Sequence, residues 1–484
     1  MYIPKIIVFC LFYCVSAFAY AEPITNIQNT GDSANRVDIV VLGDGYTAGE
    51  ISSGKYANDV DTAITNIFNQ EPFKEYKAFF NIHRIDVTSV DSGISKPGSP
   101  KNTALDAFYN CANTRRLICL SASGNTTARN IVTNSVDANQ QDIQLVIVND
   151  SEYGGSGGFR AVFSTHPAAS DIALHELGHS FGRLADEYSL GTCTTTLEPS
   201  EVNVTLQTQR NLIKWNASGG PPNGWIEFDT QIPTTGNTST LIPGLYIGGK
   251  YCTSGVYRAT YDSKMRSLNR PFNQIGQEQL IKRIYNIVSP IDRVTPLTTT
   301  LVLREGESRT FSVISPVIDA GNRSFTTTWD IDGEIVGSGT DFTVLNQNQY
   351  ADGLHTLKVV VHDPTPKIRN HTAPEESTES FKWEIDFQSI ITEIVSPANN
   401  SQFTASAVTF KWTIASDATT AWLYVGSRLG GQDILNSRIG INTTAYILAN
   451  LPEDGQVIYV RFWTRQAGAW SFVDYNYIAN SPPT

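Results

Sequence analysis

The order of apolar and polar positions from Arg36 to about Pro290 predicts alternating strands and helices. Short β-branched or nearly all-apolar runs predict strands, and apolar residues at three- and four-residue spacing predict a helix between the first two. The predicted strands and helix are residues 37–42, 55–69 (helix), 79–90 and 143–148, followed by a glycine-rich loop at 154–158 and an edge strand at 159–164. This order favours an α/β domain with a largely parallel sheet.

Beyond Pro290 the helical spacing disappears, and short apolar runs recur with turn residues between them. Asp332-Gly333 is typical of a hairpin turn. The spacing predicts two β-sandwiches of about 100 residues each. Trp329 and Trp412 are expected in their cores, because large aromatic residues in such strands are usually buried. The predicted domains are residues 22–290, 291–390 and 391–484.

The N-terminus has the order of a secretory signal: Lys5, an apolar run over residues 6–15, and Ala19-Tyr-Ala21 before Glu22. We therefore expect residues 1–21 to be a signal peptide, with cleavage after Ala21. A membrane anchor is the alternative, but the apolar run is short for a bilayer span. The expected destination is the periplasm or the extracellular space.

The balance of charged residues restricts the partners to be expected, and the number of cysteines predicts disulfides. Lys and Arg total 35 against 47 Asp and Glu, and no basic stripe occurs, which argues against nucleic acid or an anionic membrane as a partner. Removal of the signal peptide leaves four cysteines, and an even number in an exported protein predicts two disulfides. Four cysteines allow three pairings, of which we favour Cys111 with Cys119 and Cys193 with Cys252.

One motif carries chemistry: His175-Glu176-Leu-Gly-His179. On a helix the two histidines lie one turn apart on one face, so both imidazoles can bind one Zn²⁺. Glu176 is rotated by about 100° from His175, which places it beside the metal as a general base and not as a ligand.

A catalytic zinc site needs a third protein ligand, and Asp186 is the best candidate. It follows His175 by 11 residues, roughly 16 Å along a straight helix, so the helix must end first. Gly182 is expected to end it in a left-handed conformation. The weaker alternatives are Glu187, His166, His83, Glu198 and Glu201, the last two lacking the helical pattern that a thermolysin-like site requires.

Met265 is the only methionine besides the initiator, and it lies about 80 residues after the zinc motif. Two interpretations stay open at this point: a methionine turn beneath the metal ligands, or an ordinary core residue. Tyr257 and Arg258 precede it and are candidate donors to the oxyanion formed during hydrolysis.

Three stretches together resemble the bacterial IgA-peptidase family: Val41-Leu-Gly-Asp-Gly-Tyr-Thr47, the zinc motif with Leu184-Ala-Asp-Glu-Tyr188, and Ser263-Lys-Met-Arg266. The resemblance covers about residues 30–290. It implies a metzincin-like catalytic domain with Zn²⁺ held by His175, His179 and Asp186, and with Glu176 catalytic. The resemblance implies hydrolysis of peptide bonds, but it does not identify the substrate. Residues 451–463 resemble the fibronectin-like appendages of secreted bacterial proteins.

The sequence thus predicts an α/β metzincin-like zinc peptidase domain followed by two all-β sandwich domains. The expected activity is that of a secreted zinc endopeptidase acting on protein or peptide substrates, glycoproteins included. The alternative is an adhesive or carbohydrate- or protein-binding surface protein with an inactive or structural zinc domain; Glu176 argues against it, because a structural site needs no such carboxylate. A zinc esterase or deacetylase is a third class. Because the motifs precede Pro290, a chain ending there is expected to hydrolyse short peptides.

Overall fold

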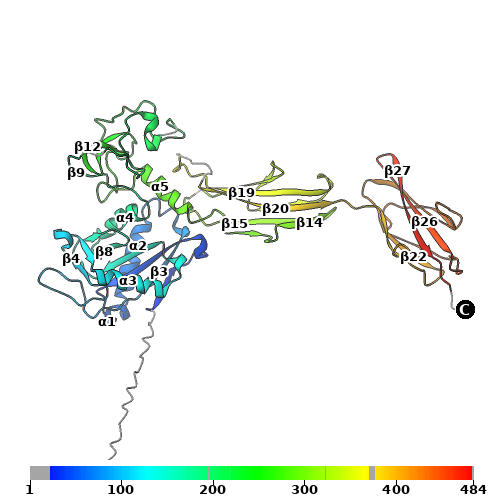
Figure 1. Ribbon diagram of the computed structural model, residues 1–484, viewed down its shortest axis with the longest axis horizontal. Helices are drawn as coiled ribbons and strands as arrows, with labels where there is room; N and C mark the ends of the chain where they lie inside the picture. The colour runs from blue at the N-terminus through cyan, green and yellow to red at the C-terminus, as the bar shows by residue number, and fades with distance from the viewer. Residues whose placement is uncertain (1–21, 194–195, 217–218, 322, 370–375, 482–484) are drawn as a thin grey trace, which may run out of the picture. The chain divides into compact units, whose positions relative to one another are not determined.

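The computed structural model describes residues 22–193, 196–216, 219–321, 323–369 and 376–481 (Figure 1). The predicted signal peptide lies outside these residues. The chain divides into two compact units: the first comprises the chain up to Val294 with Val313–Thr328 and Val360–Ser380, and the second comprises Thr295–Ser312, Trp329–Val359 and Phe381–Thr484. The domain boundaries expected from sequence stay predictions. No helix within the described residues is both long and apolar enough to cross a membrane.

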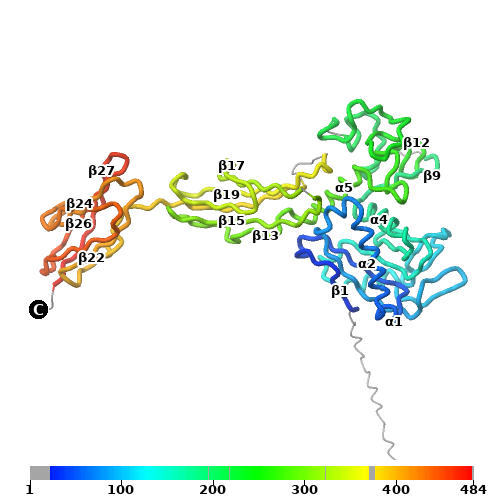
Figure 2. The backbone as a smooth tube through the Cα atoms, turned by 180° about the vertical axis from the view of Figure 1, so that it is seen from behind, coloured from blue at the N-terminus to red at the C-terminus, as the bar shows by residue number. Residues whose placement is uncertain are grey.

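A six-stranded sheet organises the first unit (Figure 1; Figure 2). In spatial order its strands are β1 (Ile24–Gln28), β3 (Phe80–Ile85), β2 (Val37–Asp44), β6 (Ile143–Val148), β8 (Ala161–Ser164) and β7 (Gly155–Ser156). The inner strands are parallel to one another, and the two edge strands, β1 and β7, are antiparallel to their neighbours. The prediction of a largely parallel sheet is therefore confirmed.

The strand predicted at the edge of the sheet is present, but it lies one position inside the edge. Residues 161–164 form β8, and the edge is β7, which comes from the predicted glycine-rich loop. A side chain at Gly155 would place its Cβ 2.8 Å from Ile172, so only a glycine lets this backbone pass so close to the neighbouring helix. The period-2 pattern cannot reveal such a strand, because its residues lack apolar side chains.

The described residues contain five α-helices, which pack on the sheet or near its ends: α1 (Ala48–Ser52), α2 (Lys55–Phe68), α3 (Ala122–Ser135), α4 (Ala169–Ser180) and α5 (Gln274–Tyr285). Alternate residues of β2 point to opposite sides. Val37, Ile39 and Val41 join the core that contains residues of α2, α4 and α5, whereas Val40 and Leu42 join the core that contains α3. Short 3-10 turns occur at Ser33–Asn35, Lys77–Phe79, Cys111–Asn113, Ala138–Gln140, Arg210–Leu212 and Lys214–Asn216.

Two small sheets carry the disulfides. β4 (Ala107–Tyr109) and β5 (Ile118–Leu120) form a hairpin closed by Cys111–Cys119. The second sheet contains β10 (Val204–Thr205), β12 (Tyr251–Arg258) and β11 (Tyr246–Gly249), with β9 (Ser189–Gly191) parallel to β12, and Cys193–Cys252 lies within it. Both predicted disulfide pairings are confirmed.

Beyond residue 292 the structure is all β. One pair of sheets has the orders β13-β15-β18 and β14-β20-β19-β16-β17, and a second pair has the orders β21-β22-β25 and β24-β23-β26-β27. The strands are β13 (Arg293–Thr295), β14 (Thr300–Arg304), β15 (Ser308–Ile314), β16 (Thr326–Ile331), β17 (Glu334–Ser338), β18 (Asp341–Leu345), β19 (Gly353–His362), β20 (Thr378–Gln388), β21 (Glu393–Ser396), β22 (Val408–Thr413), β23 (Ala418–Gly426), β24 (Leu435–Ile439), β25 (Ala445–Leu448), β26 (Val457–Gln466) and β27 (Ala469–Ile478).

Aromatic contacts join the sheets of each pair. Trp383 of β20 contacts Phe311 of β15, with ring centroids 5.1 Å apart, and Trp412 of β22 contacts Phe462 of β26 at 5.2 Å. The expected core positions of Trp329 and Trp412 are confirmed, because both side chains are buried. Asp332 and Gly333 both have positive φ and connect β16 to β17, which confirms the predicted hairpin.

The first unit also uses residues that lie beyond Pro290. Ile368 is buried in the same core as α2 and α5, and Ile318 and Phe325 pack against that core. The buried carboxylate of Asp363 accepts one hydrogen bond from the hydroxyl of Tyr76 at 2.6 Å and another from the hydroxyl of Tyr285 at 2.7 Å. No local pattern in the sequence indicated this shared core.

Candidate metal centre and catalytic cleft

Helix α4 carries both histidines of the motif on one face. Ala173, Leu174 and Leu177 on its other side are buried in the core, which fixes the rotation of the helix about its axis. The side chains of His175 and His179 are directed away from that core, with ring centroids 4.8 Å apart. The predicted i, i+4 arrangement therefore follows from how the apolar face packs.

The helix ends at Ser180, and the chain then turns back through tight hydrogen bonds. The amide of Leu184 donates to the carbonyl of Gly178 at 2.8 Å. The prediction that Gly182 adopts a left-handed conformation is wrong: Arg183 does so, with φ 53°. Gly182 is needed for another reason, since a Cβ there would lie 2.7 Å from the carbonyl oxygen of Gly178. The sequence therefore predicted correctly that the helix ends near Gly182, but it did not predict which residue adopts the left-handed conformation.

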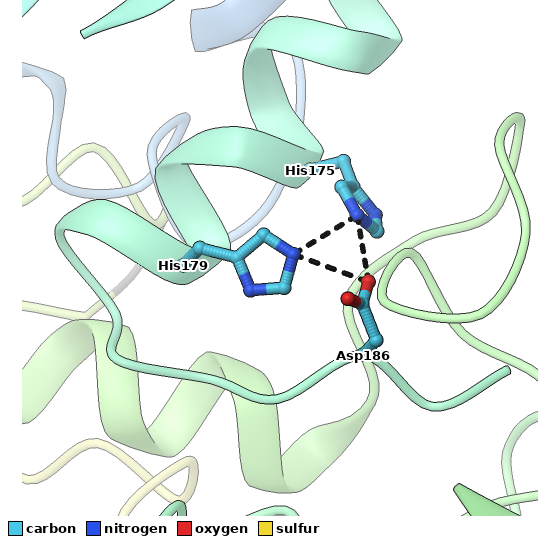
Figure 3. A group of neighbouring side chains, drawn as sticks. All are labelled: His175, His179 and Asp186. Atoms are coloured by element: carbon cyan, nitrogen blue, oxygen red, sulfur yellow. Dashed lines mark hydrogen bonds and ion pairs between the residues drawn. The ribbon is translucent and has the colours of Figure 1, made fainter. Parts of the chain in front are cut away.

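This turn brings Asp186 back to the two histidines (Figure 3). Asp186 Oδ1 lies 3.1 Å from His175 Nε2 and 3.2 Å from His179 Nε2, and the two Nε2 atoms are 3.1 Å apart. Within the part of the chain that the structure describes, these residues form the group of side chains whose ligand atoms could hold a metal ion. Their role as ligands stays a prediction.

The tautomers of the histidines indicate what belongs between these atoms. His175 Nδ1 lies 2.9 Å from the carbonyl oxygen of Lys264, and His179 Nδ1 lies 2.7 Å from that of Leu184. A carbonyl accepts only, so each Nδ1 carries the proton and each Nε2 of the neutral ring presents a lone pair. Two lone pairs and a carboxylate oxygen then face one another, an arrangement that repels unless a cation lies between them.

The spacing also fits a metal ion. Ligands bound at about 2.1 Å in a tetrahedral site lie about 3.4 Å apart. The three measured separations of 3.1 to 3.2 Å are close to that value. Asp186 is held by further contacts, because the hydroxyl of Tyr251 donates to Oδ2 and the amide of Lys250 donates to its carbonyl oxygen at 2.7 Å.

The ionisation of Asp186 suits a ligand. Burial alone raises the pKa of this carboxyl, but its contacts with His175 and His179 and the hydrogen bond from Tyr251 outweigh burial and hold the pKa well below its usual range. Asp186 is therefore a carboxylate throughout the neutral range.

Glu187 does not lie at this site. Its side chain is fully buried and points into a polar network, where it accepts hydrogen bonds from Ser263 Oγ at 2.7 Å, Asn203 Nδ2 at 3.0 Å and Asn273 Nδ2 at 3.1 Å. Its amide donates to the carbonyl of Met265 at 2.8 Å. The structure thus separates the leading candidate for third ligand, Asp186, from its fallback.

Met265 packs against helix α4 at Gly178, the residue before His179. A Cβ on Gly178 would approach the Met265 sulfur to 2.4 Å, so the methionine lies directly beneath that glycine. The side chain is also buried within the main core of the first unit. The interpretation as a core residue is confirmed, whereas a methionine turn beneath the metal ligands stays a prediction.

Glu176 lies beside the three converging residues and contacts the segment next to β7. A Cβ on Gly157 would lie 1.7 Å from Glu176 Oε2, so this carboxylate packs directly on the glycine backbone. Burial raises the pKa of Glu176, and the neighbouring histidines oppose that rise. The residue is half-buried and lines two clefts, one with His175 and one with His179 and Asp186.

The other histidines and acids named from sequence lie elsewhere. His83 Nε2 contacts the buried carboxylate of Asp38 at 2.6 Å, and His166 Nδ1 accepts from the amide of Ala168 at 3.1 Å. Neither belongs to the metal-like group. Glu198 accepts from Thr205 and Leu206, and Glu201 pairs with Lys250 at 2.8 Å, so neither of these acids reaches His175.

The suggestion that Arg258 is an oxyanion donor is not supported by its contacts. Its guanidinium is buried and donates to the backbone carbonyls of Ile247, Gly248 and Tyr261. Sequence reasoning missed two tyrosines instead: Tyr188 lines the cleft with His175 and Glu176, and Tyr251 contacts both Tyr188 and Asp186. Tyr188 ends the Leu-Ala-Asp-Glu-Tyr stretch, which was the available signal.

Comparison of the sequence with known protein families gives a match within the first unit. Residues 25–237 match the family model described as IgA Peptidase M64. The match confirms the resemblance to this family over these residues and supports a peptidase, a hydrolase, as the class of enzyme. No curated protein matches the sequence.

Similar solved structures are all-β modules. The fibronectin(III)-like modules of Clostridium thermocellum CbhA are 14% identical over 20% of this chain and 94% of theirs, with a TM-score of 0.14. Three domains of the bacteriophage RB49 Highly Immunogenic Outer Capsid protein are 10% identical over 40% of this chain and 69% of theirs, with a TM-score of 0.18. The titin domains z1z2, solved in complex with telethonin, are 12% identical over 39% and 96%, also at 0.18. Scores this low carry no argument, so the all-β architecture rests on the strand pairing above.

Proposed function

We propose that this protein is a secreted zinc endopeptidase that hydrolyses protein or peptide substrates. One observation carries the proposal: three electron-pair donors, His175 Nε2, His179 Nε2 and Asp186 Oδ1, converge beside the uncoordinated carboxylate of Glu176. Two imidazoles and a carboxylate form a donor set that suits Zn²⁺. When bound, the ion supplies Lewis acidity, which activates a water molecule and polarises the scissile carbonyl.

Glu176 is the proposed general base. It accepts a proton from the attacking water and passes it to the nitrogen of the departing amine. Its backbone lies one residue after His175 on the same helix, so it adjoins the metal centre without being part of it. Contact with the bare backbone of Gly157 limits where its carboxylate can move.

We propose Tyr188 as the donor to the developing oxyanion, in place of Tyr257 and Arg258. Its side chain lines the cleft together with His175 and Glu176. Burial raises the pKa of Tyr188, so its hydroxyl stays protonated and able to donate. Tyr251 is already engaged by Asp186 and is better described as a residue that holds the carboxylate in place.

The architecture supports a metzincin-like arrangement. The helix ends just after its second histidine, an acidic residue returns to it, and a methionine lies beneath the helix. β7, the antiparallel edge strand, runs into the segment that touches Glu176, and the amide of its Gly155 already donates to the carbonyl of Arg116. We propose that an extended substrate pairs with the backbone that follows β7, at Gly157 and Gly158, which would carry its scissile bond past the carboxylate. The predicted signal peptide and the two disulfides support secretion.

The test combines metal analysis with peptide hydrolysis by the purified mature protein. We expect about one zinc per chain and chelator-sensitive cleavage of casein. Glu176→Gln should retain the metal while lowering turnover by about 10³-fold or more, because it removes the base and no ligand. Glu201→Gln is a matched control, since this acid lies beyond Asp186 and pairs with Lys250.

Two outcomes would contradict the proposal. Turnover of Glu176→Gln within tenfold of the parent would exclude the assigned mechanism. A metal-loaded or metal-free parent that cleaves no protein or peptide would instead favour the alternative of an adhesive or binding protein with an inactive zinc domain.

A further inference from the structure

A cleft of about 510 Å³ opens on one side of the metal centre, next to His175 and Glu176. Its walls come from five parts of the chain: the disulfide-closed loop between β4 and β5, the segment that leads into β7, the middle of helix α4, the chain at Tyr188 and Leu190, and the segment directly after Met265. Its position beside the proposed base means that a substrate side chain next to the scissile bond would enter it.

The disulfide loop is fixed against the edge of the sheet. Cys111–Cys119 closes it, the amide of Gly155 donates to the carbonyl of Arg116 at 3.0 Å, and Ser156 Oγ donates to the carbonyl of Ile118. A Cβ on Gly154 would lie 2.8 Å from the same Arg116 carbonyl, so the two backbones are in direct contact. The backbone of Arg116 is therefore held in place relative to β7.

Arg116 offers an uncommitted positive charge to the cleft. Across the described residues, no hydrogen bond or ion pair involves its guanidinium, although the side chain lines the cleft. Its neighbour Arg115 differs, because it pairs with Glu152 at 3.1 Å.

A second guanidinium lines the opposite wall. Arg266 donates to the carbonyl of Tyr261 at 3.0 Å and lies over the Tyr261 ring, 5.3 Å from its centroid. It is 3.9 Å from Asp262, a carboxylate that Arg270 also contacts. Among the residues that line the cleft, Glu176 is the one carboxylate. Two arginines against one carboxylate reserved for proton transfer leave the cleft positive, although the whole chain has a net charge of -12.

We propose that this cleft selects an acidic side chain, aspartate or glutamate, immediately next to the scissile bond of the substrate. Arg116 forms the ion pair with that carboxylate, and Arg266 adds a second positive charge from the opposite wall. Guanidinium groups pair with carboxylates through two parallel hydrogen bonds, which makes the selection geometric as well as electrostatic. This inference rests on the proposed peptidase function and names the substrate class for that site.

The experiment uses the full mature protein and a set of peptides that differ only in the residues flanking one bond. We expect cleavage next to Asp or Glu at one flanking position, with kcat/KM roughly 10- to 100-fold above that of the matching Asn or Gln peptide. Arg116→Ala should remove most of this preference, with a change below about threefold on the amide peptide. Arg116→Lys should restore part of it, because the charge returns without the bidentate geometry.

Arg115→Ala is the matched control in the same disulfide loop, and it should leave the acidic preference unchanged. Arg116→Glu should shift the preference toward Lys or Arg peptides, which a merely structural role would not produce. Thermal unfolding of each variant shows whether the loop still folds.

The outcomes separate the inference from the function beneath it. Cleavage without acidic preference, or an equal loss on acidic and amide peptides in Arg116→Ala, overturns the inference and leaves the peptidase assignment standing. Failure of the metal-loaded parent to cleave any peptide overturns the proposed function, and the inference with it.

Discussion

Ending the chain at Pro290 should destabilise the first unit, although every proposed site residue precedes that point. The compact unit includes Val313–Thr328 and Val360–Ser380, which such a shortened chain lacks. The core would lose Ile368 together with the packing of Ile318 and Phe325. The surface exposed in their place is apolar and belongs to the core shared with α2 and α5.

The magnitude follows from burial. Losing the apolar contacts of buried Ile368 and of partly buried Ile318 and Phe325 lowers the unfolding free energy by about 3 to 6 kcal/mol. The two hydrogen bonds from Tyr76 and Tyr285 to Asp363 add about 1 kcal/mol each, because the freed hydroxyls turn to water. A loss of about 5 to 8 kcal/mol is comparable with the whole stability of a typical domain, about 5 to 15 kcal/mol.

Urea unfolding of chains 22–290 and 22–390, each with zinc added, measures this difference. We expect the longer chain to unfold cooperatively and the shorter one to be partly unfolded without denaturant. In the intact protein, Ile368→Ala should cost about 2 to 4 kcal/mol, whereas Ile314→Ala, at a side chain 46% exposed, should cost less than about 0.5 kcal/mol. Unfolding free energies of the two chains within about 1 kcal/mol of each other would refute the shared core and restore Pro290 as the boundary.

Two further predictions concern the site itself. Asp186→Asn should lower zinc affinity at least about tenfold in equilibrium dialysis, because the amide is a poor ligand. Glu187→Gln should keep the metal and lower the unfolding free energy by roughly 1 to 2 kcal/mol, because its new amide hydrogens would face the donors of Asn203 and Asn273. A larger loss of zinc affinity in Glu187→Gln than in Asp186→Asn would identify Glu187 as the ligand. Tyr188→Phe should lower kcat about 100-fold with unchanged zinc content, and an unchanged kcat would assign the oxyanion to another donor.

Local patterns predicted much of this fold because the features they describe are local. Strand runs such as residues 143–148, the Asp332-Gly333 turn and the spacing of His175 and His179 each depend on neighbours in the sequence. The disulfide pairings followed from cysteine count and separation. The structure also brings Asp186 to the histidines, as the need for a third ligand predicted, while its role as ligand stays a prediction.

The features that sequence reasoning missed depend on contacts between distant segments. Tyr251 reaches Asp186 across 65 positions, and Asp363 reaches Tyr76 across 287. Strand β7 was not predicted, because glycines carry no hydrophobic pattern. The left-handed conformation of Arg183 was not predicted, because the turn around this residue imposes it. Arg116 has no motif at all, and its place in the cleft appears only once the disulfide loop is docked on β7.

The different environments of Asp186 and Glu187 follow from backbone geometry. After the turn at Arg183 the chain is no longer helical, and in extended backbone successive side chains point to opposite sides. One carboxylate therefore faces the histidines, and the next faces Ser263, Asn203 and Asn273 behind the chain. The buried network around Glu187 fixes this segment, which together with the contacts of Tyr251 and Lys250 holds Asp186 beside the two histidines. An insertion or deletion of one residue between Arg183 and Asp186 would exchange the two sides, which places the turn length under the same constraint as the ligands.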